Sequence, residues 1–200
     1  MSTPYNEMQL DALRELANIG AGTAATALSQ MLGQDVELTV PRALALPLAD
    51  AVDAAGKPDA IVTGVVLPLE GHFDAVVLLL IPRRDAETLC ELLGVEAGTE
   101  VGDSALGEIG NILGTSYLNA LASMTGLELV PCPPELNTDL LAAIVASLLA
   151  HTAAETDTAL LLDSELQLAD EACSLSFMLI AAAASVDELL APLGLAGSAG

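Results

Sequence analysis

Aromatic and basic side chains are both scarce in this chain. Its 200 residues include two Tyr, two Phe and no Trp, and only five Lys or Arg stand against 28 Asp or Glu. Hydrophobic residues still make up 53% of the chain, so a sizeable core can be buried and extensive disorder is excluded. Without aromatics this core must consist of Ala, Leu, Val and Ile, which suits helices packed closely on a sheet.

The shortage of basic residues excludes a nucleic-acid partner, because no Lys/Arg cluster is available to neutralise phosphates. The formal net charge is −23, and the acids are spread along the chain rather than gathered in one tail. Such a charge destabilises the compact state by self-repulsion unless salt screens it. We therefore interpret the sequence as that of a halophile's protein, with a surface suited to high salt.

Cysteines and long apolar runs are few as well. Cys90, Cys132 and Cys173 are far apart and none has the spacing of a metal site, so we expect no metal bound by this chain. Their odd number, without a signal-type N-terminus, indicates reduced thiols in a cytoplasm. The uncharged stretches at 140–150 and 173–186 are too short, or too rich in Ala and Ser, to predict a membrane span.

An internal duplication organises the chain. Residues 11–41 align without a gap on residues 104–134, a shift of 93, and ten of these 31 positions are identical. The identities include Glu, Asn, Met, Gly and Pro, which composition explains less easily than matches of Ala or Leu. We therefore predict a single domain over residues 1–200 made of two repeats, at about 5–93 and 100–193, with a flexible tail at 194–200.

Both repeats show the same predicted order of helix, strand, helix, hairpin and helix. After the long helix and first strand, the patterns predict helices at 48–55 and 84–93 around strands at 60–69 and 72–81, a linker at 94–103, and then helices at 139–153 and 186–190 around strands at 158–166 and 172–181. Hairpins imply antiparallel pairing. The predicted class is therefore α+β, a pseudo-two-fold duplicated domain with long helices packed on a mixed, largely antiparallel sheet.

A polar stripe occurs once on each predicted long helix. Its members are spaced four and three residues apart, so they share one helix face. They are Asp11, Glu15 and Asn18 in the first repeat and Ser104, Glu108 and Asn111 in the second. Asn costs up to about 0.7 kcal/mol relative to Ala inside a helix. Two mid-helix asparagines in register therefore indicate a duplicated polar site, although the residues alone leave open whether it is functional or only solvated.

Four glycines lie near these asparagines. Each destabilises a helix interior by about 1 kcal/mol relative to Ala. They are Gly20, Gly22, Gly110 and Gly114. A missing side chain allows close approach to the helix backbone. We expect the twin helix to make that approach, with a docking partner as the alternative.

The stripe resembles the motif of the CheC/CheX/FliY family of chemotaxis phosphatases, and the two copies and the chain length resemble its CheC members most. The family pattern is Asp or Ser, three residues, Glu, two residues, Asn, then 22 residues and Pro. Pro41 completes it in the first repeat and Pro134 in the second. The resemblance implies an enzyme that hydrolyses the aspartyl phosphate of a CheY-type response regulator. It assigns catalysis to Glu15, Asn18, Glu108 and Asn111.

The chemistry implied by the resemblance suits these residue types. An Asn amide offers a donor and an acceptor, so it can orient the attacking water without taking its proton. A Glu carboxylate can pair with the active-site Lys of the regulator. The Mg²⁺ is expected in the acidic pocket of the regulator, and no cofactor is expected in this chain.

A second interpretation is a non-catalytic adaptor that binds CheD, the receptor deamidase, and the phosphorylated regulator. The two intact Glu/Asn pairs favour catalysis over this alternative. Pro41 and Pro134 follow strand-like stretches, and we expect each to end a strand. His72 and His151 fall outside the motif and are interpreted as incidental.

Overall fold

The computed structural model describes residues 7–70, 75–151, 158–168 and 171–193, so the predicted tail at 194–200 and His72 lie outside the described residues. The elements in chain order are α1 (Glu7–Leu32), β1 (Val36–Pro47), α2 (Leu48–Ala55), β2 (Ile61–Glu70), β3 (Ala75–Pro82), α3 (Arg83–Leu92), α4 (Glu100–Thr125), β4 (Val130–Pro131), β5 (Glu135–Leu140), α5 (Leu141–His151), β6 (Thr158–Leu168), β7 (Glu171–Ala181), α6 (Ala183–Leu190) and a 3₁₀ turn (Ala191–Leu193). None of these helices combines the length and apolar character that a membrane crossing requires.

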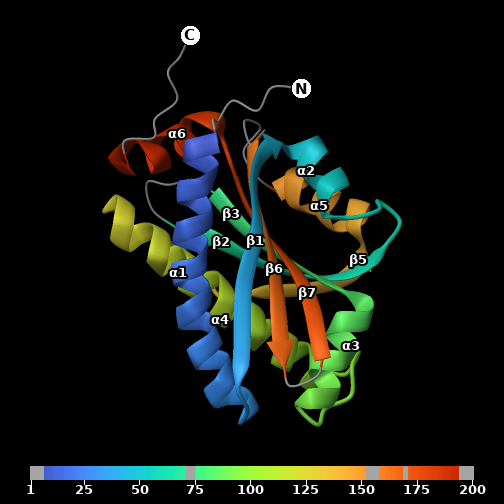
Figure 1. Ribbon diagram of the computed structural model, residues 1–200. Helices are drawn as coiled ribbons and strands as arrows, with labels where there is room; N and C mark the ends of the chain where they lie inside the picture. The colour runs from blue at the N-terminus through green and yellow to red at the C-terminus, as the bar shows by residue number, and fades with distance from the viewer. Residues whose placement is uncertain (1–6, 71–74, 152–157, 169–170, 194–200) are drawn as a thin grey trace.

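Seven strands of the described residues form one sheet, in the order β1-β6-β7-β3-β2, with β4 and β5 both paired to β2 (Figure 1). The order is symmetric about the β7–β3 pair. The strands that follow each long helix pair with the hairpin of the other repeat: β1 pairs with β6, and β4 and β5 pair with β2. The predicted α+β class with a largely antiparallel sheet is confirmed, and every described strand pair is antiparallel.

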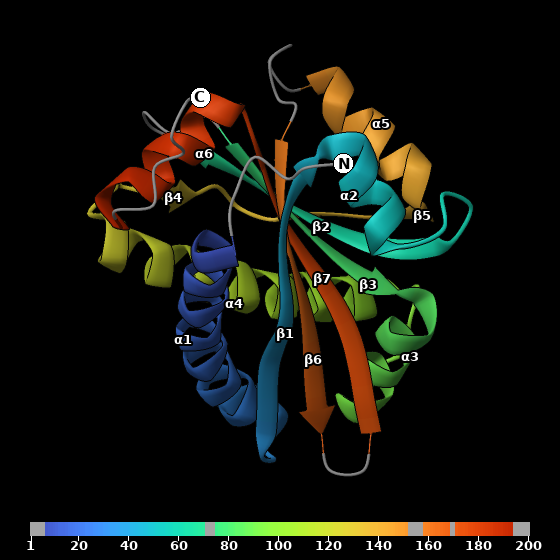
Figure 2. The same cartoon turned by 45° about the horizontal axis from the view of Figure 1, so that its top comes forward.

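Helices cover both faces of this sheet (Figure 2). α1, α3, α4 and α6 pack on one face, and α2 and α5 pack on the other. The central strand β3 contributes to both cores, with Val77 and Leu79 facing the long helices and Leu78 and Leu80 facing α2 and α5. Because both faces are covered, this strand is a continuous apolar run rather than an alternating one.

The two long helices approach each other closely at Gly20. A Cβ added there would lie 2.7 Å from Cδ1 and 3.0 Å from Cα of Tyr117, so the expected close approach of the twin helix is confirmed at this glycine. Gly110 and Gly114 face the sheet rather than the twin helix. An added Cβ would meet side chains of β2 at 2.7 Å and 3.1 Å, which means that these two glycines let α4 lie against β2.

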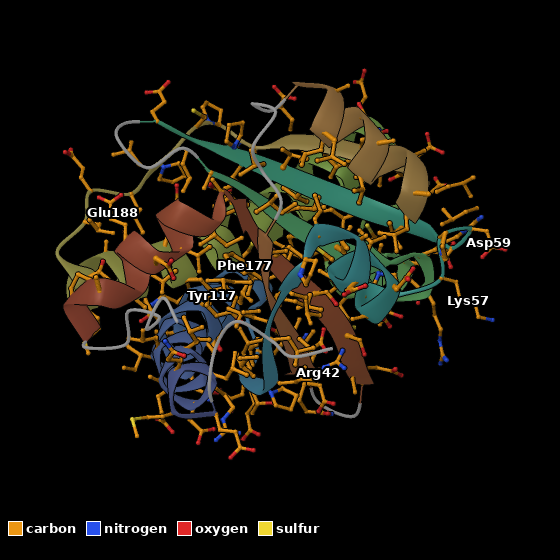
Figure 3. All side chains as sticks on the ribbon, turned by 90° about the horizontal axis from the view of Figure 1, so that it is seen from above. Arg42, Lys57, Asp59, Tyr117, Phe177 and Glu188 are labelled. Carbon is orange, nitrogen blue, oxygen red and sulfur yellow. The ribbon has the colours of Figure 1, made fainter. Side chains whose placement is uncertain are left out.

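Tyr117 also fastens α4 to the core. Its ring meets that of Phe177 edge to face, with 4.9 Å between centroids and 78° between planes (Figure 3). Its hydroxyl shares a 2.8 Å hydrogen bond with the buried Ser164 on β6. Burial raises the pKa of Tyr117 to about 12, so the phenol stays neutral at physiological pH.

Some element boundaries differ from the predicted ones. α4 begins at Glu100, inside the predicted linker, because the Thr99 hydroxyl caps it by accepting a 3.2 Å hydrogen bond from the Gly102 N–H. α5 begins at Leu141 rather than 139, because residues 139 and 140 belong to β5 and pair with β2. α6 begins three residues earlier than predicted, at Ala183.

Candidate functional site

The four motif side chains predicted to act lie on accessible faces of α1 and α4. Glu15, Asn18 and Glu108 are exposed, and Asn111 is half-buried. The opposite faces of both helices are buried in the core against the sheet. Each Glu/Asn pair is therefore held on a fixed helix and remains within reach of a docking partner.

In the first repeat the Asn18 amide is already engaged by the protein. Its Nδ2 donates to the Arg14 carbonyl at 3.0 Å, and its Oδ1 accepts from the Val40 N–H at 3.1 Å. An amide has two N–H donors and can accept two hydrogen bonds. One donor and one acceptor position therefore remain for a water or a partner.

The bond to Val40 exists because β1 has a bulge. The pairing of β1 with β6 shifts register between Thr39 and Arg42, so residues 40 and 41 fall outside the paired register. The prediction that Pro41 ends a strand is therefore wrong, since β1 continues to Pro47. Proline has no N–H to donate and is tolerated at a bulge. The 22-residue spacing of the motif brings this bulge next to Asn18.

The second repeat has a different arrangement around Asn111. Its Oδ1 lies 3.5 Å from the Thr115 hydroxyl, the outer limit of a hydrogen bond. Pro134 lies in the break between β4 and β5, directly before β5 rather than at the end of a strand. The residue before it, Pro133, takes the place that Val40 has in the first repeat. Since proline has no N–H, the backbone bond of the first site cannot form here.

An open cleft of about 610 Å³ lies beside the second site. It is lined by Ser104, Glu108 and Pro134 of the motif, together with the carboxylates of Glu100 and Asp103. The fold thus brings three of the four motif positions to one concave surface, although 25 residues separate Glu108 from Pro134 in the sequence. This surface is acidic.

A basic side chain accompanies only the first of the two motifs. Arg14 pairs with Asp11 at 3.1 Å, one turn before Asn18, and both side chains are exposed. The corresponding residue in α4 is Gly107, which lines the cleft without filling it. Sequence reasoning did not use this difference, although the alignment of the repeats contains it.

Metal ligands are not gathered in the part of the chain that the structure describes. No group of three His, Cys, Asp or Glu side chains there could hold an ion. The first motif site contains two carboxylates, an amide and a proline, and in the second site the Ser104 hydroxyl stands where the first has the Asp11 carboxylate. What they can do by themselves is bind a cationic group and orient a small polar molecule.

Comparison with known proteins defines the class. The CheC-like family matches residues 8–44 and 101–138, the segments that carry the two motifs. Over 168 residues, 80% of each chain, the sequence is 35% identical to the CheY-P phosphatase CheC of Bacillus subtilis. The flagellar motor switch phosphatase FliY of the same organism is 36% identical over 104 residues, 52% of this chain and 26% of that protein.

The fold agrees with these relationships. The crystal structure of Thermotoga maritima FliY superposes with a TM-score of 0.75 at 18% identity, over 94% of this chain and 97% of that one. The chain therefore belongs to the CheC-like family.

Proposed function

We propose that the chain hydrolyses the aspartyl phosphate of a CheY-type response regulator. The observation that carries this proposal is the doubled Glu/Asn pair, held on accessible faces of two rigid helices within the segments that match the CheC-like family. It is supported by a relative covering 80% of the chain that bears the name CheY-P phosphatase. Both glutamates and Asn18 are exposed, and Asn111 is half-buried.

The asparagines place the nucleophile. A water attacks phosphorus in line with the aspartyl oxygen, the phosphorus–oxygen bond to the aspartate breaks, and the proton of the water leaves with the phosphate. Phosphoryl transfer of this kind depends on positioning and charge stabilisation more than on covalent help. Asn18 and Asn111 can each hold the water by one N–H and one carbonyl lone pair.

The glutamates dock the regulator. Glu15 and Glu108 lie one helical turn before the asparagines, so a carboxylate can pair with the active-site Lys of the regulator while the amide reaches the phosphoryl group. A carboxylate beside the phosphoryl group would be repelled without an intervening cation. We assign the Mg²⁺ to the acidic pocket of the regulator, so that this chain supplies only side chains.

We also propose CheD, the receptor deamidase, as a second partner and the cytoplasm as the compartment. The CheD proposal rests on the family resemblance alone. The cytoplasmic location is supported by the free thiols of Cys90, Cys132 and Cys173, which a reducing compartment maintains. A binding measurement with purified CheD tests the partner, and absence of binding at micromolar concentrations would remove it.

Double variants separate the two roles. Asn18→Ala with Asn111→Ala should lower the turnover rate by about 100-fold or more, the scale of a lost positioning group. Binding of the phosphorylated regulator, or of a stable analogue, should change little. Glu15→Lys with Glu108→Lys should instead weaken binding by about 2 kcal/mol or more, through loss of a desolvated charge pair.

The assay is phosphate release from a purified phosphorylated regulator, combined with an affinity measurement. Gln30→Ala with Asn119→Ala is the matched control, since these are exposed polar residues of α1 and α4 outside the motif. Full turnover in the asparagine double variant would contradict the positioning role. The adaptor interpretation would then describe the chain better.

A further inference from the structure

We infer that the two sites are unequal, with Asn111 supplying most of the turnover and Asn18 mainly fastening β1 to α1. This inference rests on the proposed phosphatase function. It starts from one hydrogen bond, from the Val40 N–H to Asn18 Oδ1, which the first site makes and the second cannot.

The Asn18 bond satisfies a buried backbone donor. Val40 is 2% exposed, and its N–H lies at the bulge, outside the register that pairs β1 with β6. A buried N–H without an acceptor is strongly disfavoured. The bonds to Arg14 and Val40 fix the directions of the remaining N–H and lone pair of Asn18, and rotating the amide to aim them at a bound phosphoryl group would leave the Val40 donor without its partner. The first site therefore has a structural reason to keep its amide in place.

The Asn111 amide cannot accept the corresponding backbone hydrogen bond from the segment that follows α4. Pro133 occupies the position equivalent to Val40 and has no N–H. The contact with the Thr115 hydroxyl is 3.5 Å long and easily exchanged for a bond to water. The second amide can therefore turn to the substrate without uncovering a buried backbone group.

The charged residues around the two sites also favour the second site. At the first site Arg14 pairs with Asp11, so its positive charge offsets one of the two motif carboxylates that could attract a Lys of the regulator. Gly107 leaves the equivalent place open, and Glu100 and Asp103 add negative charge to the cleft beside Glu108. A regulator with a cationic active-site side chain is therefore attracted more strongly to the second site.

Single asparagine variants test the inference. Two equal sites would each supply half the rate, so either single variant would keep half of it. We expect Asn111→Ala to lower turnover by about 10-fold and Asn18→Ala by less than about twofold, because the second site supplies most of the positioning. Equal losses, or a larger loss at Asn18, would overturn the inference. Asn119→Ala is the control for α4 and Gln30→Ala for α1.

Stability gives a readout that needs no catalysis. Asn18→Ala leaves the Val40 N–H unpaired, so its melting temperature should fall by about 3–8 °C. Asn111→Ala removes no bond to a buried backbone group, and its melting temperature should change by less than half as much. The opposite order in thermal melts would count against the structural role of Asn18.

A reciprocal exchange of the two backbone positions tests the cause. Val40→Pro removes the donor and creates the Pro-Pro sequence that the second repeat already contains. In the Asn111→Ala background it should raise the remaining turnover several-fold, about threefold or more, by freeing Asn18. Pro133→Val should lower the turnover of the otherwise unchanged protein, because it offers Asn111 a backbone donor.

These outcomes can be told apart from failure of the proposed function. If the unchanged protein does not accelerate phosphate release from the regulator, the proposed function fails, while the melting temperatures still report on the Val40 bond. If it does accelerate release and neither exchange alters the rate, the backbone donor is not the cause and this inference fails. Val40→Pro counts only where its thermal unfolding remains cooperative, and Pro133→Val provides the converse measurement.

Discussion

The two repeats carry the same motif at the same spacing, but the strand after each long helix is built differently. In the first repeat β1 is one strand of twelve residues that passes through Pro41 by a bulge. In the second repeat the chain forms the two-residue β4 and the six-residue β5, separated by residues 132–134. Spacing along a helix thus places an amide, whereas the neighbouring backbone decides whether that amide is engaged.

Charge separates the repeats as well. All five Lys and Arg lie within residues 1–100, while residues 101–200 contain 13 acids and no basic residue. Those basic residues include Arg42 on β1 (Figure 3). Arg42 pairs with Asp163 of β6, and Arg14 pairs with Asp11 at the first site. A duplication can therefore retain its motif while the electrostatic surroundings of the two copies diverge.

The largest expected effect comes from separating the repeats. Cutting the chain between Val95 and Thr99 should leave two fragments that each fail to fold, because β1 needs β6 and β5 needs β2. Mixed or co-expressed fragments should recover the far-ultraviolet circular dichroism of the intact chain. A fragment that unfolds cooperatively by itself would show that the repeats are independent, and the comparison would then be one of two domains.

The salt dependence of unfolding tests two things: whether the net charge limits stability, and whether the shared sheet makes both repeats unfold together. With a net charge of −23, we expect loss of folding below roughly 0.5 M monovalent salt, as self-repulsion becomes unscreened. Because the repeats share one sheet, both should unfold in a single transition despite their different charge. An unchanged melting midpoint between low and molar salt would contradict the prediction. Two separate transitions would contradict the cooperativity.

A smaller effect distinguishes two neighbouring glycines of α1. Gly20→Ala should destabilise the protein by about 1–3 kcal/mol, because the added Cβ meets the backbone of α4 near Tyr117. Gly22→Ala should stabilise it by about 0.5–1 kcal/mol, since nothing lies within 4 Å and alanine favours a helix. Denaturant unfolding at constant high salt measures both.

The control in this pair is built in, because both changes add the same methyl group to the same helix. Equal effects would show that the approach of α1 and α4 is looser than the Gly20 contact indicates. A loss of regulator affinity in Gly22→Ala alone would instead place the docking partner over this exposed part of α1.

Much of the fold was predictable because its signals are local. The helix predicted at 48–55 coincides with α2, and the strands predicted at 60–69 and 158–166 differ from β2 and β6 by no more than two residues at either end. The spacing of Glu and Asn within each motif needed only the period of a helix. These features depend on neighbouring residues, which the sequence presents in order.

The arrangement of the sites was decided by tertiary structure. Nothing in the local pattern shows that β1 pairs with β6, that Pro41 lies at a bulge, or that the Val40 N–H turns to Asn18. A strand's partner depends on packing across the whole sheet. The direction of one backbone N–H depends on register, which can change at a single residue. The sequence by itself therefore determined which side chains recur and how they are spaced, and only the fold decided that the Asn18 amide accepts a hydrogen bond from the strand that follows its helix.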